Sequence, residues 1–219
     1  MQAIFQFLNG LKENNTKEWF NDNRKDYETA KEQMLFFTEI MIQEIRKFDH
    51  DIPMMSPKEC LFRIFRDVRF SNDKSPYKTN MGSFIAKGGR KSELGGYYVH
   101  FEPGASFIGG GVWCPEADVL RAIRTEIYEH PEGFKEVFED EDFKNTFPDI
   151  MGEKLKTAPK GFDKEFPDID LLRYKSYAFG HSLSDQEALS ADLIDEAVIM
   201  FHQLSFMNRF LNDAIIKHR

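Results

Sequence analysis

The sequence predicts an α+β fold in which an antiparallel sheet of about four strands packs against a long N-terminal helix and C-terminal helices. Apolar residues recur at helical spacing at both ends of the chain, whereas the middle has short apolar runs separated by Gly-rich or Pro-Gly turns. Strands bracketed by helices in this way are typical of α+β proteins. Because the 219 residues contain no internal repeat and no low-complexity linker, we expect a single domain over residues 1–219.

The N-terminal part of the chain is expected to form three helices. Residues 2–13 carry apolar side chains at helical spacing, which predicts a helix with one buried face. Asn15, followed three positions later by Glu18, resembles a capping box and is expected to start a second helix. From about residue 24 to residue 48 the apolar positions step by three or four, which predicts a long helix with one buried stripe.

The middle of the chain is expected to form an antiparallel meander. Its four predicted strands are residues 61–70, 82–87, 97–102 and 106–113, each an alternating or apolar run next to turn-forming residues. A Pro-Gly pair at 103–104 suits the tight turn between the last two strands.

Helices are expected to resume after the meander, interrupted at most by one short strand. Pro115 suits the first turn of a helix, because proline lacks the N–H group that is unpaired there. Residues 131–172 predict short helices and loops, and the pattern allows a strand around residues 175–179. Ser190 is expected to cap a long final helix.

Charge is unevenly distributed along the chain. The net charge of −8 argues against nucleic-acid binding over the general surface. Residues 58–91 nevertheless carry nine Lys or Arg against three Asp or Glu, a local balance of +6, so the rest of the chain sums to −14. This segment is therefore the part of the protein best suited to an anionic partner.

The cysteine count and the apolar runs predict a cytoplasmic protein. Two cysteines, Cys60 and Cys114, are too few for a disulfide framework and suit a reducing compartment. The chain has no apolar stretch of 18 residues and no basic N-terminal region followed by an apolar run. We therefore expect neither a membrane span nor a secretory signal.

The predicted strand 61–70 places an arginine on a core-like face. An arginine cannot lose its charge at neutral pH, so a half-buried Arg66 needs either an internal carboxylate or an anionic ligand. Both accounts stay open from sequence, and one bulge near Asp67 would exchange the two faces. At period two, one face holds Phe62, Ile64, Arg66, Val68 and Phe70, and the other holds Arg63, Phe65, Asp67 and Arg69.

The loop SNDKSPYK continues this basic segment, and together they form the candidate site. Our leading hypothesis is that the site binds an anionic small molecule, or a phosphate group on a larger partner, without a cofactor. There is no P-loop motif, and no spacing typical of a metal site. The predicted ligand-binding residues are Arg63, Arg66, Asp67, Arg69, Asp73, Lys74, Tyr77 and Lys78.

Two alternatives to simple anion binding remain. The protein could be an enzyme acting on a phosphorylated substrate, in which case Asp67, Asp73 or Tyr77 would have to supply the base or nucleophile. Alternatively, the charges could form only internal ion pairs that tie the strand, the loop and the acidic helices together. The sequence assigns no catalytic residue.

Residues 95–113 contain three further features that the sequence leaves open. His100 alternates with Tyr98 and Glu102, and a single histidine in such a pattern is more often an ordinary surface or core residue than a catalyst. The glycines at 109–111 favour a bulge or bend over the close approach of a ligand. Trp113 is interpreted as a core anchor, with a pocket wall as the alternative.

Several segments in order along the chain resemble a bacterial family of uncharacterised conserved proteins, domain-of-unknown-function family twenty-four sixty-one. The resemblance marks the basic segment as a region of interest, but it implies no activity and no catalytic residue. The segments are NNTKEWFNDNRKDY (14–27), RIFRDVRFSNDKSPYKTN (63–80), GGYYVHFEPGASFIGGGVWCP (95–115), LKTAPKGF (155–162) and LLRYKSY (171–177).

Overall fold

The computed structural model describes residues 1–69 and 72–219, and in it the chain has an α+β architecture around one four-stranded antiparallel sheet. Phe70 and Ser71, at the end of the first predicted strand and the start of the loop, lie outside the described residues. The strands follow chain order across the sheet. They are β1 (Met81–Ile85), β2 (Gly96–Phe101), β3 (Ser106–Val112) and β4 (Tyr177–Leu183).

Three of the predicted strands are confirmed. The predictions at 82–87, 97–102 and 106–113 correspond to β1, β2 and β3. Ala105 donates a backbone hydrogen bond of 2.9 Å to Glu102, and Gly104 has φ of 79°, so the Pro-Gly pair forms the expected turn. In the sheet His100 lies opposite Gly82 on β1 and Phe107 on β3, which sets the neighbours of the site described below.

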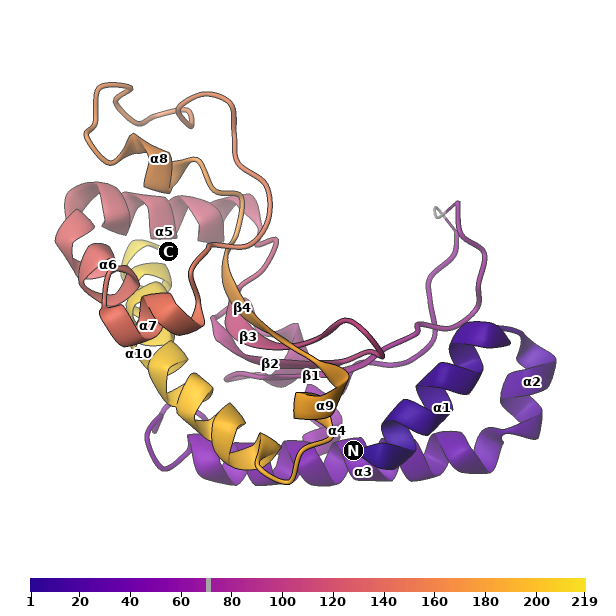
Figure 1. The fold of residues 1–219 in the computed structure, drawn as a ribbon. Coiled ribbons are helices and arrows are strands. Elements are labelled where there is room, and N and C mark those ends of the chain that lie inside the picture. Colours follow the sequence, from indigo (N-terminus) through magenta and orange to yellow (C-terminus); the bar gives the residue numbers. More distant parts are fainter. Residues whose placement is uncertain (70–71) are drawn as a thin grey trace.

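The predicted strand at 61–70 is wrong over its described residues, because only Leu61 and Phe62 bond to β1 and the residues after them pair with the following part of the same segment. Apart from isolated bridges at Leu61 and Phe65 it has no strand pairing in residues 61–69. The backbone N–H of Arg66 donates to Pro76 at 3.0 Å, and that of Lys78 donates to Ile64 at 2.8 Å. Residues 61–69 and 72–80, here called the arm, therefore project from the sheet (Figure 1). The fourth strand is β4, which overlaps the short strand allowed at 175–179.

The N-terminal helices form as predicted, but the start of the second one differs. Thr16, not Asn15, is its N-cap, and the Thr16 hydroxyl accepts a hydrogen bond from the Trp19 N–H at 3.2 Å. Asn15 instead bonds to the arm. The helices before the sheet are α1 (Gln2–Glu13), α2 (Lys17–Asp22), α3 (Arg24–Ile45) and the short α4 (Pro57–Cys60).

The C-terminal helices also form where expected. Ser190 lies two residues before the N-cap position of the last helix and accepts a hydrogen bond from the Asp192 N–H at 3.1 Å, so the predicted cap is displaced. None of the described helices combines the length and apolar character needed to cross a bilayer. The remaining elements are η1 (Gly89–Lys91), α5 (Ala117–Glu129), α6 (Pro131–Phe138), α7 (Glu141–Thr146), α8 (Ile169–Leu172), α9 (Asp185–Ala188) and α10 (Leu193–His218).

The two longest helices cover one face of the sheet. Tyr97, Val99 and Phe101 alternate along β2 and are all fully buried. The Phe101 ring meets Phe37 of α3 at 5.4 Å, and the Tyr97 ring meets Phe201 of α10 at 5.2 Å. Aromatic packing of this kind buries roughly 150–250 Å² per ring, so it supplies much of the core expected of a Phe-rich chain. Figure 1 shows α3 and α10 on the same side of the sheet.

The opposite side of the sheet is flanked by loops. In Figure 1 the arm rises at one end of the sheet, and the segment that carries α8 rises at the other end. Because side chains alternate along a strand, Tyr98 and His100 of β2 must point to this side when Tyr97 and Val99 point to the helices. The functional site described below lies here.

Candidate functional site

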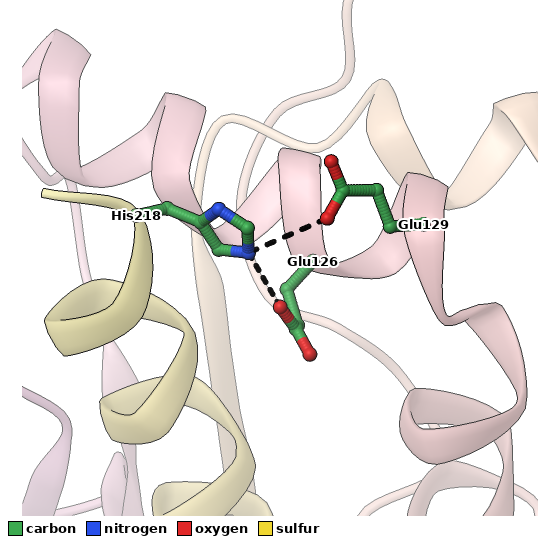
Figure 2. Close-up of side chains that lie close together, drawn as sticks. All are labelled: Glu126, Glu129 and His218. Atoms are coloured by element: carbon green, nitrogen blue, oxygen red, sulfur yellow. Dashed lines mark hydrogen bonds and ion pairs between the residues drawn. The ribbon is translucent and has the colours of Figure 1, made fainter.

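One cluster of potential metal ligands joins the ends of two helices. Glu126 and Glu129 of α5 and His218 of α10 place their ligand atoms within 4.8 Å of one another (Figure 2). Glu126 already accepts hydrogen bonds from Lys217 at 2.8 Å and from His218 at 2.5 Å. Burial raises the pKa of Glu126, but these bonds outweigh it and lower the pKa overall. The Lys217 ammonium group would compete with a metal ion for this carboxylate. The cluster therefore serves as a set of polar contacts between α5 and α10.

A larger feature is a cleft of about 610 Å³ against the sheet face that the long helices leave uncovered. It extends from the arm across β1, β2, β3 and β4 to the segments before β2 and after β3. Volumes of this order are typical of pockets for small ligands, which are mostly apolar with a few placed polar groups. Its apolar lining includes Phe62, Phe84, Tyr98, Phe107, Trp113 and Met151.

A row of three polar side chains, here called the polar row, crosses this face along β2. Tyr98, His100 and Glu102 lie two residues apart, so the pleat of the strand points them to the same side. The Tyr98 hydroxyl lies 3.0 Å from Nδ1 of His100, and Nε2 of His100 lies 3.1 Å from Oε2 of Glu102. The hydroxyl of Thr79, from the base of the arm, donates to Oε1 of Glu102 at 2.6 Å.

The partners of His100 determine which nitrogen carries its proton. A carboxylate can only accept, so Nε2–H of His100 donates to Glu102, and Nδ1 of the neutral ring is left to accept from Tyr98. The ring is held by stacking on Phe107, with centroids 4.8 Å apart. Burial, followed by the negative charge of Glu102, raises the pKa of Tyr98 to about 12, so its hydroxyl is protonated at neutral pH.

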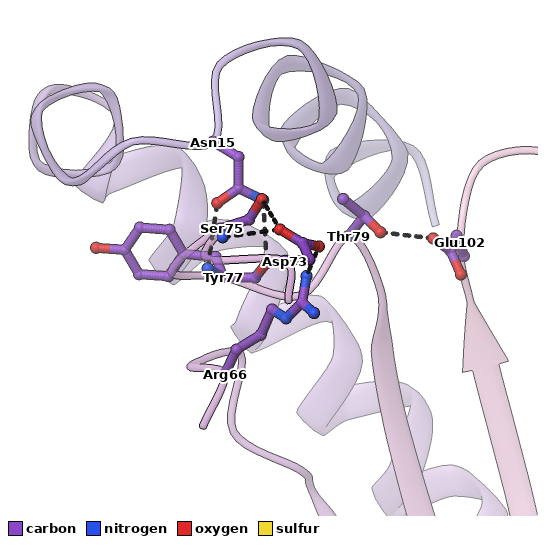
Figure 3. Close-up of polar contacts among 7 residues, drawn as sticks. All are labelled: Asn15, Arg66, Asp73, Ser75, Tyr77, Thr79 and Glu102. Carbon is purple, nitrogen blue, oxygen red and sulfur yellow. Dashed lines mark hydrogen bonds and ion pairs between the residues drawn. The ribbon is translucent and has the colours of Figure 1, made fainter. Parts of the chain in front are cut away.

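The tip of the arm uses most of its charges internally. Arg66 forms an ion pair with Asp73 (Figure 3), and Arg69 binds Asp67 through two hydrogen bonds of 2.6 and 2.9 Å. The side-chain and backbone hydrogen bonds of Ser75, together with Arg66, lower the pKa of Asp73 to about 2. These contacts favour the internal ion-pair account for this part of the predicted site.

The lysine at the tip and the tyrosine of the predicted site also serve the structure. Nζ of Lys74 donates to the carbonyl of Val68 at 3.0 Å. Tyr77 is buried and stacks on Phe20 with ring centroids 4.1 Å apart, so its side chain belongs to the core. The amide of Asn15 bonds to both the N–H and the C=O of Tyr77, at 3.1 and 3.0 Å (Figure 3).

Two cations at the base of the arm differ from those at its tip. Among the described residues, no carboxylate lies within ion-pair distance of Arg63 or Lys78. Lys78 is half-buried with its ammonium group 5.6 Å from the Phe62 ring centroid, and its pKa is lowered by burial and by the charge of Arg63. A second hollow, of about 390 Å³, is lined by Arg66, Asp67, Lys78, Thr79 and Asn80.

The hollow and the cleft are neighbours. Phe62 lines the cleft and meets the Tyr98 ring at 6.0 Å, while Lys78 of the hollow lies over Phe62. Thr79 also lines the hollow and bonds to the polar row. Phe62 therefore contacts both Lys78, which lines the hollow, and Tyr98, which lines the cleft.

The glycines and tryptophan after the turn have different roles in the structure. A Cβ atom on Gly110 or Gly111 would lie 2.2 Å from a carbonyl oxygen of a neighbouring strand, and Gly111 has φ of +91°. Close strand approach and backbone conformation therefore account for these glycines, in line with the predicted bend. The Trp113 side chain is 59% exposed and borders the cleft, so the interpretation as a core anchor is wrong.

Sequence reasoning did not identify the polar row as a site. The signal was present as Tyr, His and Glu at alternate positions of a strand. What the sequence could not show was which face of that strand the helices leave uncovered, and that Thr79 and Phe107 would fix the row from two sides.

Comparison with known proteins gives one family. The model of a family described as "Conserved hypothetical protein (DUF2461)" matches residues 3–210. Neither the curated proteins nor the solved structures gave a match.

Proposed function

The chain belongs to the conserved hypothetical protein family (DUF2461), and from that premise we propose that it binds a small anionic molecule with an aromatic or apolar body. The body occupies the cleft against the sheet, and the carboxylate or phosphate group lies beside Lys78, with Arg63 close by. A cytoplasmic location belongs to the same proposal, and it agrees with the two free cysteines.

The half-buried Lys78 is the observation that carries this proposal. Removing an ammonium group from water without an opposing charge is unfavourable, and a second cation nearby adds to that cost. No described carboxylate forms an ion pair with Lys78, whereas the tip arginines Arg66 and Arg69 each have one. A bound anion would supply the missing charge.

The lining of the cleft supports an aromatic or apolar body for the ligand. Phe62, Phe84 and Phe107 present ring surfaces around the space, and ring–ring contacts contribute about 0.5–1.5 kcal/mol beyond area burial. Since Phe62 also touches Lys78, a ligand ring in the cleft can keep its anionic group close to the ammonium. Inorganic phosphate alone would leave the apolar lining unused.

Thermal denaturation with added anions tests the proposal. Benzoate, phenylacetate and phenyl phosphate should raise the melting temperature of the wild-type protein more than the same concentration of inorganic phosphate. The Lys78→Ala variant should lose most of that increase. Lys144→Ala, which removes the same charge from an exposed position on α7, should keep it. Equal shifts in the two variants, or no shift with any aromatic anion, would refute the proposal.

The two alternative functions receive unequal support. An enzyme using Asp67, Asp73 or Tyr77 as base is not favoured, because both carboxylates are paired with arginines and Tyr77 is buried in the core. The internal ion-pair account fits the tip of the arm. It does not extend to Lys78.

A further inference from the structure

We propose that Tyr98, His100 and Glu102 form a proton relay that makes the cleft catalytic, and that it reversibly removes a proton from the carbon next to the carbonyl group of an aromatic 2-oxo acid. This inference rests on the proposed function, because the cleft must first hold the aromatic acid. It adds a reaction to the binding site and assigns that reaction to residues outside the basic arm.

The hydrogen bonds of the polar row set the direction of proton transfer. Glu102 holds the Nε2–H of His100, so Nδ1 is the basic end of the ring and is aimed at the Tyr98 hydroxyl 3.0 Å away. Serine hydrolases use the same order of hydroxyl, imidazole and carboxylate to activate a hydroxyl group. Here a phenol takes the place of the serine, on a strand that fixes all three groups.

The proposed step is a proton transfer alone. The Tyr98 oxygen takes the proton from the substrate carbon while the proton of Tyr98 passes to Nδ1 of His100. The electron pair of the broken C–H bond becomes the enolate, and the imidazolium formed is stabilised by the charge of Glu102. The reverse transfer restores the ketone and the relay, so no oxidant, reductant or other reactant is consumed.

The neighbours of Tyr98 fix its position in the cleft. A Cβ atom on Gly82 of β1 would lie 2.6 Å from the Tyr98 hydroxyl oxygen, so the phenol can occupy this place only because residue 82 is glycine. The ring meets Phe62 at 6.0 Å on one side and Phe107 at 5.4 Å on the other. Because burial keeps the pKa of Tyr98 high, the phenol needs His100 to accept its proton as it acts as a base.

The substrate class follows from the groups that surround Phe62. Lys78 suits a carboxylate, the phenylalanine rings suit an aromatic ring, and Lys78 and Tyr98 both lie next to the Phe62 ring. An aromatic 2-oxo acid has a group for each of them. Its carboxylate is followed by the carbonyl, by a carbon whose hydrogens the carbonyl acidifies, and by the ring.

Hydrogen–deuterium exchange at carbon tests the relay. Phenylpyruvate is incubated with the protein in D₂O, and loss of its CH₂ signal is followed by proton NMR. A positioned acid–base group typically contributes about 100-fold or more, so we expect at least that acceleration over buffer. Tyr98→Phe should return the rate to that of buffer, whereas Tyr128→Phe, which removes a hydroxyl from exposed α5, should keep the full rate.

Parallel thermal shifts separate the two proposals. If phenylpyruvate raises the melting temperature but exchange is not accelerated, the relay is refuted and the binding proposal stands. If phenylpyruvate does not bind, the substrate class fails, and the binding proposal is decided by benzoate, phenylacetate and phenyl phosphate. The nitrogen NMR spectrum of His100 then decides the relay, since a ring with its proton on Nδ1 at neutral pH would refute it and one with its proton on Nε2 would support it.

Discussion

Thr79 donates a hydrogen bond of 2.6 Å to the Glu102 carboxylate and so connects the base of the arm to the polar row on the sheet. The arm carries the proposed anion-binding part of the site, and β2 carries the proposed proton relay, so this contact joins the two parts. Lys78 is the residue before Thr79, and His100 is bound to the other oxygen of Glu102. Any displacement of the arm therefore changes the support of His100.

Replacing Thr79 by valine should remove this hydrogen bond while keeping the shape of the side chain. We expect Thr79→Val to lower the free energy of unfolding by about 1.5 kcal/mol, because the bond involves a charged acceptor that is largely shielded from water. Urea denaturation measures the change. Thr79→Ser keeps the hydroxyl, so its free energy of unfolding should fall clearly less than that of Thr79→Val. An equal fall in both variants would show that the stability depends on the methyl group and not on the hydrogen bond.

The hydrogen bonds that Asp73 accepts from Ser75, together with its ion pair with Arg66, predict a dependence of stability on pH. The pKa of Asp73 is lowered to about 2 from an ordinary value of 3.8, so the folded state binds this proton more weakly than the unfolded state does. Its stabilising contribution is therefore complete above about pH 4 and is lost as the pH falls toward 2. Asp73→Asn should lower the melting temperature at pH 7 and have little effect at pH 2.

The control for this prediction is Asp213→Asn, at an exposed position on α10. It removes the same charge without touching the arm and should change the melting temperature little at pH 7. A difference between Asp73→Asn and the wild type that persists undiminished at pH 2 would contradict the role of the ionised carboxylate.

Local periodicity predicted most of the elements, but not the partner of each one. The spacing of apolar residues located α1, α3 and the first three strands within a few residues. In the arm the predicted faces also hold: Ile64 is buried, Arg66 is half-buried, and Arg63 and Asp67 are exposed. Alternation fixes which side chains share a face. It does not show whether the backbone pairs with a sheet or with a later part of the same segment.

The sequence predicted only part of the candidate site, again because it does not show which groups meet in the folded chain. Sequence showed an excess of Lys and Arg at 58–91, but it could not show that Asp67 and Asp73, within the same segment, would neutralise Arg69 and Arg66. Lys78, for which no ion pair is found among the described residues, differs from Arg66 and Arg69 through tertiary structure.

Asn15 matches a local helix-capping pattern, but in the structure its side chain contacts a segment that is distant in sequence. It was predicted to cap a helix, yet its amide bonds to the backbone of Tyr77 on the arm at 3.0 and 3.1 Å. Asn15→Ala should lower the free energy of unfolding by about 1–3 kcal/mol, because it leaves backbone groups unpaired. It should also speed proteolysis of the arm. Asn21→Ala, exposed on α2, is the control, and similar proteolysis of both variants would contradict this role.

The two cysteines should differ in reactivity. Burial, followed by the charge of Glu59, raises the pKa of Cys60 to about 11, whereas Cys114 is exposed and borders the cleft. At pH 8 iodoacetamide should modify Cys114 alone, as measured by mass spectrometry. An aromatic anion in the cleft should slow that reaction.

The Cys114→Ser variant is the control and should take up no label at pH 8. The folded state holds the Cys60 proton more tightly than the unfolded state, so this contribution to stability is complete below about pH 9 and is lost as the pH rises toward 11. Rapid labelling of Cys60 at pH 8 would contradict the burial of this thiol.

Gly82 and Tyr98 should show a strong energetic coupling. In Gly82→Ala the new Cβ would lie 2.6 Å from the Tyr98 hydroxyl, and we expect a loss of about 1–3 kcal/mol from overpacking. Adding Tyr98→Phe removes the closest atom, so the double variant should recover much of the loss relative to Tyr98→Phe alone. The recovery should be partial, because the carbonyl oxygen of Val99 would still lie 3.0 Å from the Cβ. Strictly additive losses in urea denaturation would mean that the phenol does not rest on Gly82, and the geometry proposed for the relay would then be wrong.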